Sequence, residues 1–193
     1  MIQDKYIEQF VHILQSVRLT EKHGEEIGNY TKIIEVLVSR FQSVRSRKGQ
    51  VFMIGNGGSA AIAGHMTADF MKNGGVRTCS LYDSAVLTCL GNDYGYEYVF
   101  SKQLEFLMGK KDLLVCISSS GNSRNILNAI GAAEEKKAEI ITFTGFKPDN
   151  EARGRGDFNV YVPMEQYGMV ESIHNLMLQQ VVDILMLKIW EEK

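Results

Sequence analysis

The sequence predicts an α/β fold, in which helices cover both faces of an open and mostly parallel sheet. Short apolar runs bounded by glycine and polar residues alternate with segments whose apolar positions recur at helical spacing. Strands that alternate with helices of about 10–15 residues are typical of parallel sheets covered on both faces. The expected strands are residues 51–54, 76–81, 113–117, 139–145 and 158–163.

A chain of 193 residues can bury a full hydrophobic core, so we expect one domain over residues 1–193. Within it, residues 1–47 are expected to form a helical N-terminal extension and residues 48–193 an α/β core. A net charge of −2 gives no electrostatic basis for binding nucleic acid. No run of about 18 apolar residues occurs, so we expect no membrane span. The three cysteines lie in apolar surroundings without CxxC spacing, which favours reduced thiols in a cytoplasmic protein: Cys79, Cys89 and Cys116.

The N-terminal extension contains two stripes of apolar residues at helical spacing. One runs from Ile7 to Val17, and the other runs from Ile27 to Phe41. A charged stretch at residues 21–26, which contains one glycine, is expected to link or kink the two helices. The second stripe covers a wide arc of its helix, which favours pairing with another subunit.

Hydroxyl groups cluster directly after the expected strand at residues 113–117. The loop at residues 118–123 reads Ser-Ser-Ser-Gly-Asn-Ser and precedes a helix that begins at Arg124. The first N–H groups of a helix lack partners and its dipole favours negative charge, so this loop can hold an anion. No GxxxxGK[ST] pattern occurs, which favours a small phosphorylated ligand over a nucleotide. A serine-rich turn that only caps the helix is the alternative.

A second polar loop, Gly-Asn-Gly-Gly-Ser at residues 55–59, follows the first strand of the expected core. Its three glycines permit positive φ angles and a close approach of the backbone to a ligand. Ser59 is expected to cap a helix at residues 60–71. The glycine spacing does not match a dinucleotide fingerprint. Both loops follow parallel strands, so they are expected to meet at the carboxyl edge of the sheet, where ligands bind.

Together these features resemble the sugar isomerase (SIS) domain family, and within it most closely the phosphoheptose isomerases. The resemblance is carried, in this order, by GNGGSAA at residues 55–61, His65, GNDYG at residues 91–95 and the loop at residues 118–123. It covers nearly the whole chain. It implies a three-layer fold with a five-stranded parallel sheet, two N-terminal helices and a long C-terminal helix. It also implies a homotetramer with active sites at subunit interfaces.

The resemblance implies which residues bind a phosphorylated sugar. The serines of the 118–123 loop hold the phosphate, and the glycine-rich loop approaches the sugar. An expected turn at residues 91–96 contacts the sugar hydroxyl groups. The implied substrate-binding residues are Asn56, Gly57, Gly58, Ser59, Asn92, Asp93, Ser118, Ser119, Ser120 and Ser123.

The resemblance also implies an acid/base pair that moves a proton between neighbouring carbons and, in several relatives, a divalent metal that is usually zinc. The implied catalytic residues are Asp69, Glu171 and His174, and the implied Zn²⁺ ligands are His65, Asp69, Glu171 and Gln179. Relatives carry glutamate in place of Asp69, in many cases glutamine in place of Glu171, and histidine in place of Gln179. Glutamine cannot act as a general base near neutral pH. His174 has an alternative interpretation as a hydrogen-bonded core residue.

Two functional hypotheses follow. The first is an aldose–ketose isomerase that converts sedoheptulose 7-phosphate to a heptose 7-phosphate for surface-polysaccharide precursors. The second is a non-catalytic phosphosugar-binding protein that acts as a regulatory scaffold, as in the subgroup that includes the replication-initiator-associating protein DiaA. Gln179 favours the scaffold, whereas the intact loops, Glu171 and the nearby His174 favour the isomerase. Of the two, we favour the isomerase.

Overall fold

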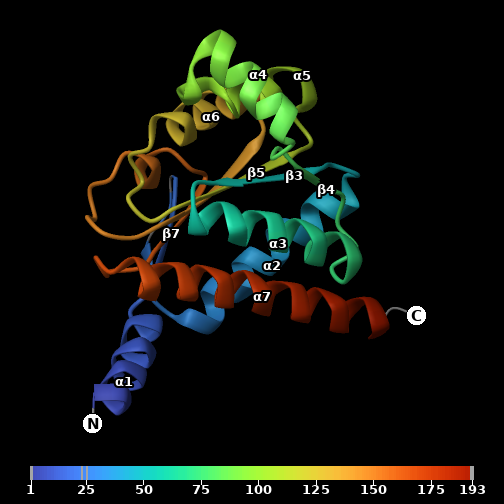
Figure 1. The fold of residues 1–193 in the computed structure, drawn as a ribbon. Coiled ribbons are helices and arrows are strands. Elements are labelled where there is room, and N and C mark those ends of the chain that lie inside the picture. Colours follow the sequence, from blue (N-terminus) through green and yellow to red (C-terminus); the bar gives the residue numbers. More distant parts are fainter. Residues whose placement is uncertain (1, 23, 25, 192–193) are drawn as a thin grey trace.

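A seven-stranded sheet forms the centre of the computed structural model, which describes residues 2–22, 24 and 26–191 (Figure 1). The strand order is β2-β1-β7-β6-β5-β3-β4. All neighbouring pairs from β7 to β4 in this order are parallel. The predicted α/β fold with a mostly parallel sheet is therefore confirmed. The parallel strands are β3 (Val51–Gly55), β4 (Thr78–Ser80), β5 (Leu113–Ser118), β6 (Glu139–Thr144) and β7 (Phe158–Tyr161).

The N-terminal segment adds two strands that the sequence analysis missed. β1 (Arg18–Glu21) pairs antiparallel with β7 and with β2 (Glu26–Ile27). The predictions of a five-stranded sheet and of a purely helical segment at residues 1–47 are therefore wrong. β1 covers the edge of β7, with Leu19 fully buried and the charged residues Arg18 and Glu21 half-buried. The charged stretch expected to link two helices instead includes the end of β1 and the start of β2.

Helices cover both faces of the sheet, as Figure 1 shows. On one face lie α4, α5 and α6, and on the other lie α2, α3 and α7, while α1 extends away from the body. The strands separate two apolar cores, because alternate side chains point to opposite faces. The helices are α1 (Ile2–Gln15), α2 (Tyr30–Ser46), α3 (Gly58–Lys72), α4 (Ser84–Tyr94), α5 (Ser101–Leu107), α6 (Arg124–Glu135) and α7 (Tyr167–Glu191).

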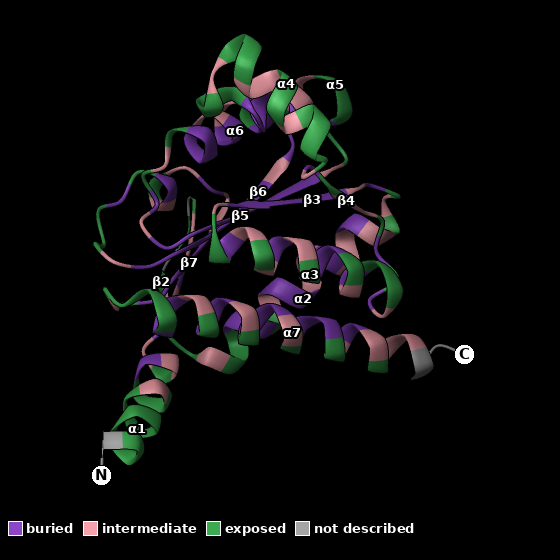
Figure 2. Ribbon diagram, viewed as in Figure 1, coloured by how far each residue is buried: buried purple, intermediate pink, exposed green. Residues whose placement is uncertain are grey.

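Burial differs strongly between the layers. Figure 2 shows the central strands as buried, whereas α4 is exposed or half-buried along its whole length. α7 is 25 residues long and packs against α2 and α3. Despite this length, neither α7 nor any other helix in the described part of the chain is both long and apolar enough to cross a membrane.

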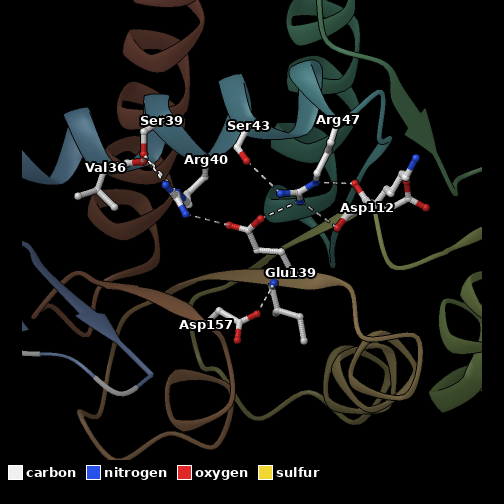
Figure 3. Close-up of polar contacts among 10 residues, drawn as sticks. Val36, Ser39, Arg40, Ser43, Arg47, Asp112, Glu139 and Asp157 are labelled. Carbon is white, nitrogen blue, oxygen red and sulfur yellow. Dashed lines mark hydrogen bonds and ion pairs between the residues drawn. The ribbon is translucent and has the colours of Figure 1, made fainter.

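The amino-terminal edge of the sheet is held to α2 by a network of charged groups (Figure 3). Arg47 Nη2 donates to Glu139 Oε2 at 2.7 Å, and Arg47 Nε donates to the Lys111 carbonyl at 2.8 Å. Arg40 Nη1 lies 3.9 Å from the other carboxylate oxygen of Glu139. These bonds join the end of α2 to the starts of β5 and β6. Structural contacts thus occupy this edge, whereas the two polar loops lie at the opposite edge.

Candidate active site

The two polar loops meet in one pocket at the carboxyl edge of the sheet. The pocket has a volume of about 380 Å³. β3 and β5 are neighbouring strands whose following helices, α3 and α6, lie on opposite faces, so the pocket is at the topological switch point where ligands bind. The lining residues are Asn56, Gly57, Gly58, Ser59, Ile117, Ser118, Ser119, Ser120, Ser123, Tyr167 and Glu171. The structure thus brings together every predicted substrate-binding residue except Asn92 and Asp93, and adds Glu171.

Two residues of the serine loop, Ser119 and Ser123, have hydroxyl groups that the loop itself does not use. Ser119 Oγ is buried and has no hydrogen-bond partner. Ser123 is the N-cap residue of α6, but its side chain makes no capping bond. An unpartnered buried hydroxyl costs about 1–3 kcal/mol, so its presence at a helix N-terminus indicates a ligand that accepts hydrogen bonds. These features favour an anion over the purely capping alternative.

The backbone of the serine loop is fixed before any ligand arrives. Gly121 has φ +64°, and a Cβ at this position would overlap the Asn150 side chain. The Ala152 N–H donates to the Gly121 carbonyl at 2.9 Å, and the Glu151 N–H donates to Asn122 Oδ1 at 3.0 Å. The segment after β6 therefore braces the loop from behind.

The Glu171 carboxylate, which comes from α7, lies beside the glycine-rich loop at the start of α3. Gly57 is the N-cap residue with φ +55°, so the predicted cap at Ser59 is wrong and Ser59 lies inside the first turn. A Cβ on Gly58 would lie 2.5 and 2.6 Å from the two carboxylate oxygens of Glu171. Glycine at position 58 thus leaves room for Glu171, whose negative charge is favourable near a helix N-terminus.

A larger hollow of about 740 Å³ lies at the opposite, amino-terminal edge of the sheet. Its lining includes Arg47, which directly follows the carboxyl end of α2, and Lys137, two residues beyond the end of α6. Helix carboxyl ends carry partial negative charge, which favours cationic side chains and opposes bound anions. The smaller pocket at the carboxyl edge instead combines a helix N-terminus with the unpartnered hydroxyl group of Ser119, which makes it the better candidate for a phosphorylated ligand.

Asn92 and Asp93 do not line this pocket. The predicted turn at residues 91–96 is wrong over its first four positions, because α4 continues to Tyr94. Both side chains are exposed, and Asn92 Nδ2 donates to Asp93 Oδ1 at 2.9 Å. Their predicted contact with a sugar is therefore not formed within the pocket of a single chain.

His174 lies in the hydrophobic core and not in the pocket. Its side chain is fully buried and its ring meets Phe143 edge-on, with ring centroids 5.6 Å apart. Nε2 donates to the Thr144 carbonyl at 3.2 Å, which leaves Nδ1 as a buried acceptor without a partner. The placement supports the core interpretation over the predicted catalytic role, because no ligand in the pocket can reach the ring.

The four predicted metal ligands do not gather at one point. Glu171 lies at the start of α3, whereas His65 Nε2 pairs with Asp69 Oδ2 at 3.5 Å further along that helix. Gln179 Nε2 donates to Asp183 Oδ1 at 3.1 Å on α7. In the part of the chain that the structure describes, no three His, Cys, Asp or Glu side chains could hold a metal ion together. The residues of a single chain therefore do not fit the predicted Zn²⁺ site.

Comparison with known proteins identifies the family. The family model described as the SIS domain matches residues 5–145. The chain belongs to the SIS domain family. A phosphoheptose isomerase from Laribacter hongkongensis is 33% identical to this SIS domain over 181 residues, which cover 89% of this chain and 90% of that protein. A phosphoheptose isomerase from Glaesserella parasuis is 38% identical over 147 residues, which cover 73% and 74%.

Solved structures extend the likeness beyond the matched residues. The structure of a phosphoheptose isomerase from Francisella tularensis superposes with a TM-score of 0.81 at 25% identity, covering 94% of this chain and 95% of that one. The structure of phosphoheptose isomerase GmhA from Neisseria gonorrhoeae gives a TM-score of 0.78 at 26% identity, covering 96% and 99%. The SIS fold therefore includes α7, which supplies Glu171 to the pocket.

Three residues lie at the pocket of this SIS domain that the sequence analysis did not include among its site residues. Tyr167 lines the pocket at the start of α7, and it lies one helical turn before Glu171 on the same face. Asn125 and Tyr96 both hydrogen-bond the Asn56 side chain at the rim of the pocket. The position of Asn125, just after the serine loop, was a usable signal, whereas no local pattern indicated Tyr96.

Burial of His174 predicts a pH dependence of stability in this SIS domain. Burial lowers the pKa of His174 from 6.5 to about 4, although its hydrogen bond to Thr144 opposes the change. Well above pH 6.5 the ring is neutral in both folded and unfolded chains. Between pH 6.5 and 4 only the unfolded chain takes up the proton, so the free energy of unfolding falls by up to about 3 kcal/mol.

The measurement is chemical denaturation between pH 7 and pH 4 at one protein concentration, because assembly would otherwise shift apparent stability. In His174→Gln the amide retains a donor for Thr144 but does not titrate, so its pH slope should be shallower than that of wild type. His12→Gln, at an exposed position of α1, should keep the wild-type slope. Equal slopes for wild type and His174→Gln would contradict the prediction.

Proposed function

We propose that this SIS domain is a phosphosugar isomerase that converts sedoheptulose 7-phosphate to a heptose 7-phosphate, a precursor of surface polysaccharides. The observation that carries the proposal is the single pocket in which the serine loop, with its unpartnered Ser119 hydroxyl, faces the Glu171 carboxylate. The four relatives compared above are phosphoheptose isomerases, and their names support a seven-carbon sugar phosphate as substrate.

Aldose–ketose isomerisation transfers a proton between neighbouring carbons through an enediol, so it needs a phosphate anchor and a nearby proton-transfer group. In this proposal the hydroxyl groups and free N–H groups of the serine loop bind the phosphate. Glu171, held on α7 beside the start of α3, takes the proton from the carbon next to the carbonyl. The rigid loops keep the sugar in one orientation during the transfer.

His65 and Asp69 provide the second proton-transfer group in this proposal. His65 and Glu171 both line a second hollow of about 330 Å³, which adjoins the pocket at Gly58 and Glu171. The carboxylate of Asp69, 3.5 Å from His65 Nε2, would orient the imidazole. Asp69 thus acts through His65, and no step uses a metal ion. Zinc binding stays a prediction of the resemblance alone.

The non-catalytic scaffold remains the second candidate function, and one observation favours it. Gln179 donates to Asp183 and has no titrating group at a position where relatives are expected to carry histidine. A scaffold would keep the phosphosugar pocket and bind its ligand without turnover. The two candidates therefore predict the same binding and opposite outcomes in an isomerisation assay.

We also infer that the chain assembles as a homotetramer in the cytoplasm. α1 extends from the body and carries apolar side chains that the rest of the chain does not cover, such as Ile7, which is 62% exposed (Figure 2). On the opposite side, Phe106 of α5 is 87% exposed. A second copy of the chain could bury both surfaces. The three free cysteines agree with a reducing compartment.

The decisive experiment follows sedoheptulose 7-phosphate by NMR in D₂O with the full chain, with and without added zinc. An isomerase produces the aldose phosphate and incorporates deuterium from solvent at the carbon next to the carbonyl, because the enediol exchanges its proton. Calorimetry under the same conditions measures binding of the sugar phosphate. Binding without product or deuterium incorporation would refute the isomerase for this substrate and support the scaffold.

A further inference from the structure

A reciprocal pair of amide hydrogen bonds joins the two loops of the pocket. Asn56 Nδ2 donates to Asn125 Oδ1 at 2.9 Å, and Asn125 Nδ2 donates to Asn56 Oδ1 at the same distance. Asn56 follows β3, and Asn125, only 3% exposed, lies in the first turn of α6 after the serine loop. The pair therefore spans the gap between the carboxyl ends of the two strands.

The Tyr96 hydroxyl donates a third hydrogen bond, also to Asn56 Oδ1, at 3.0 Å. An amide oxygen has two lone pairs, and both are now engaged by Asn125 and Tyr96. The amide nitrogen has two hydrogens, of which only one is given to Asn125. Because Asn56 lines the pocket, its one free N–H can donate to a ligand, whereas its oxygen cannot accept from one.

We propose that Asn125 is a positioning residue which, together with Tyr96, holds Asn56 as a hydrogen-bond donor toward an oxygen of the bound phosphosugar. Without these partners the Asn56 amide could turn over and present its oxygen, which would repel a ligand oxygen. This proposal rests on the isomerase function and adds a specific role to its pocket. Asn125 itself contacts Asn56 and not the reacting atoms.

The donor fits the charge that isomerisation creates. When Glu171 removes the proton, the C–H electron pair forms the carbon–carbon double bond and the carbonyl π pair moves onto the oxygen. A fixed N–H aimed at that oxygen stabilises the enediolate more than the neutral carbonyl, so its loss lowers kcat more than it raises KM. A donor that must first rotate into place is less effective, because reorientation costs free energy during the reaction.

The test compares two alanine variants on the same helix. Asn125→Ala removes both amide bonds to Asn56. Asn128→Ala, one turn later on α6, removes a side chain that donates to the Glu97 carbonyl at 2.8 Å and makes no bond to Asn56. Asn125→Ala should lower kcat about 10- to 100-fold with KM within about threefold of wild type, and Asn128→Ala should leave both within about twofold.

A double-mutant cycle with Tyr96→Phe separates positioning from packing. In Tyr96→Phe both reciprocal amide bonds between Asn125 and Asn56 remain, so this change by itself should lower kcat by less than about threefold. In the Asn125→Ala background the same change should lower kcat by a further tenfold or so, because residues that share a partner are not additive. The proposal would be overturned if the two substitutions affected kcat independently of each other, or if the variants differed from wild type only in Tm.

A binding measurement keeps the proposal testable even if the wild-type chain does not isomerise the sugar. A sugar-phosphate hydroxamate is a stable mimic of the enediolate, and inorganic phosphate reports the serine loop alone. Asn125→Ala should weaken hydroxamate binding about tenfold and leave phosphate binding unchanged. If both ligands bind Asn125→Ala as tightly as wild type, or if wild type binds the hydroxamate no better than phosphate, Asn125 has no positioning role. If the hydroxamate and phosphate affinities follow the expected pattern but the wild-type chain does not turn over the sugar, only the isomerase function is refuted.

Discussion

The Glu171→Gln variant is expected to isomerise sedoheptulose 7-phosphate about 10²- to 10⁴-fold more slowly than the wild-type chain, the range that proton-transfer groups contribute. Glutamine keeps the size of the side chain and its place between α7 and the start of α3, but its amide cannot take a proton. Binding through the serine loop should persist, so the change is expected in kcat and not in KM. Steady-state kinetics with the NMR assay measures both.

Glu165→Gln is the matched control for this change. Glu165 lies shortly before α7, is exposed and does not line the pocket, so its loss of charge should leave kcat within about twofold of wild type. Equal Tm values for the two variants would show that Glu171→Gln is folded. A folded Glu171→Gln chain that retains full kcat would remove Glu171 from the mechanism and leave His65 with Asp69 as the proton-transfer pair.

The parallel part of the fold could be predicted because its signals are local. β5 and β6 are apolar runs bounded by turn residues, and a polar loop follows each of them. The loop after β5 leads into an amphipathic helix. β1 and β2 are four and two residues long, too short for a periodic pattern. They exist because β7 offers an open edge, which is tertiary information. The sequence could not show that edge.

The site likewise has a part that local sequence signals predict and a part that depends on tertiary packing. Loops after neighbouring parallel strands must converge, so the residues at 56–59 and 118–123 were predictable. The orientation of α7 was not, because apolar residues surround the helix and Leu187 is 53% exposed. Glu171 and His174 are about 60° apart around the helix, and packing alone sends one to the pocket and the other to the core. Spacing on α3 correctly paired His65 with Asp69, but it could not show whether Glu171 joins them.

The Gly58→Ala variant is expected to lose about 10²-fold in kcat while it keeps nearly its full stability. The three atoms nearest to a Cβ at position 58 would all belong to the Glu171 carboxyl group, with its oxygens at 2.5 and 2.6 Å and Cδ at 2.7 Å. These atoms end a flexible side chain, so they can move away without disturbing the backbone. A displacement of the proton-transfer group by about 1 Å suffices to cost about 10²-fold in rate. Kinetics and thermal unfolding of the same preparation measure both quantities.

Gly64→Ala, two turns further along α3, is the matched control, because a Cβ there meets nothing within 4 Å. Alanine is favoured over glycine inside a helix, so Gly64→Ala should be more stable by about 0.5–1 kcal/mol and fully active. Loss of kcat in Gly58→Ala without loss of stability therefore isolates the Glu171 carboxylate as the group displaced. If Gly58→Ala turns over like wild type, the carboxylate works from another position and its contact with the start of α3 is not part of catalysis.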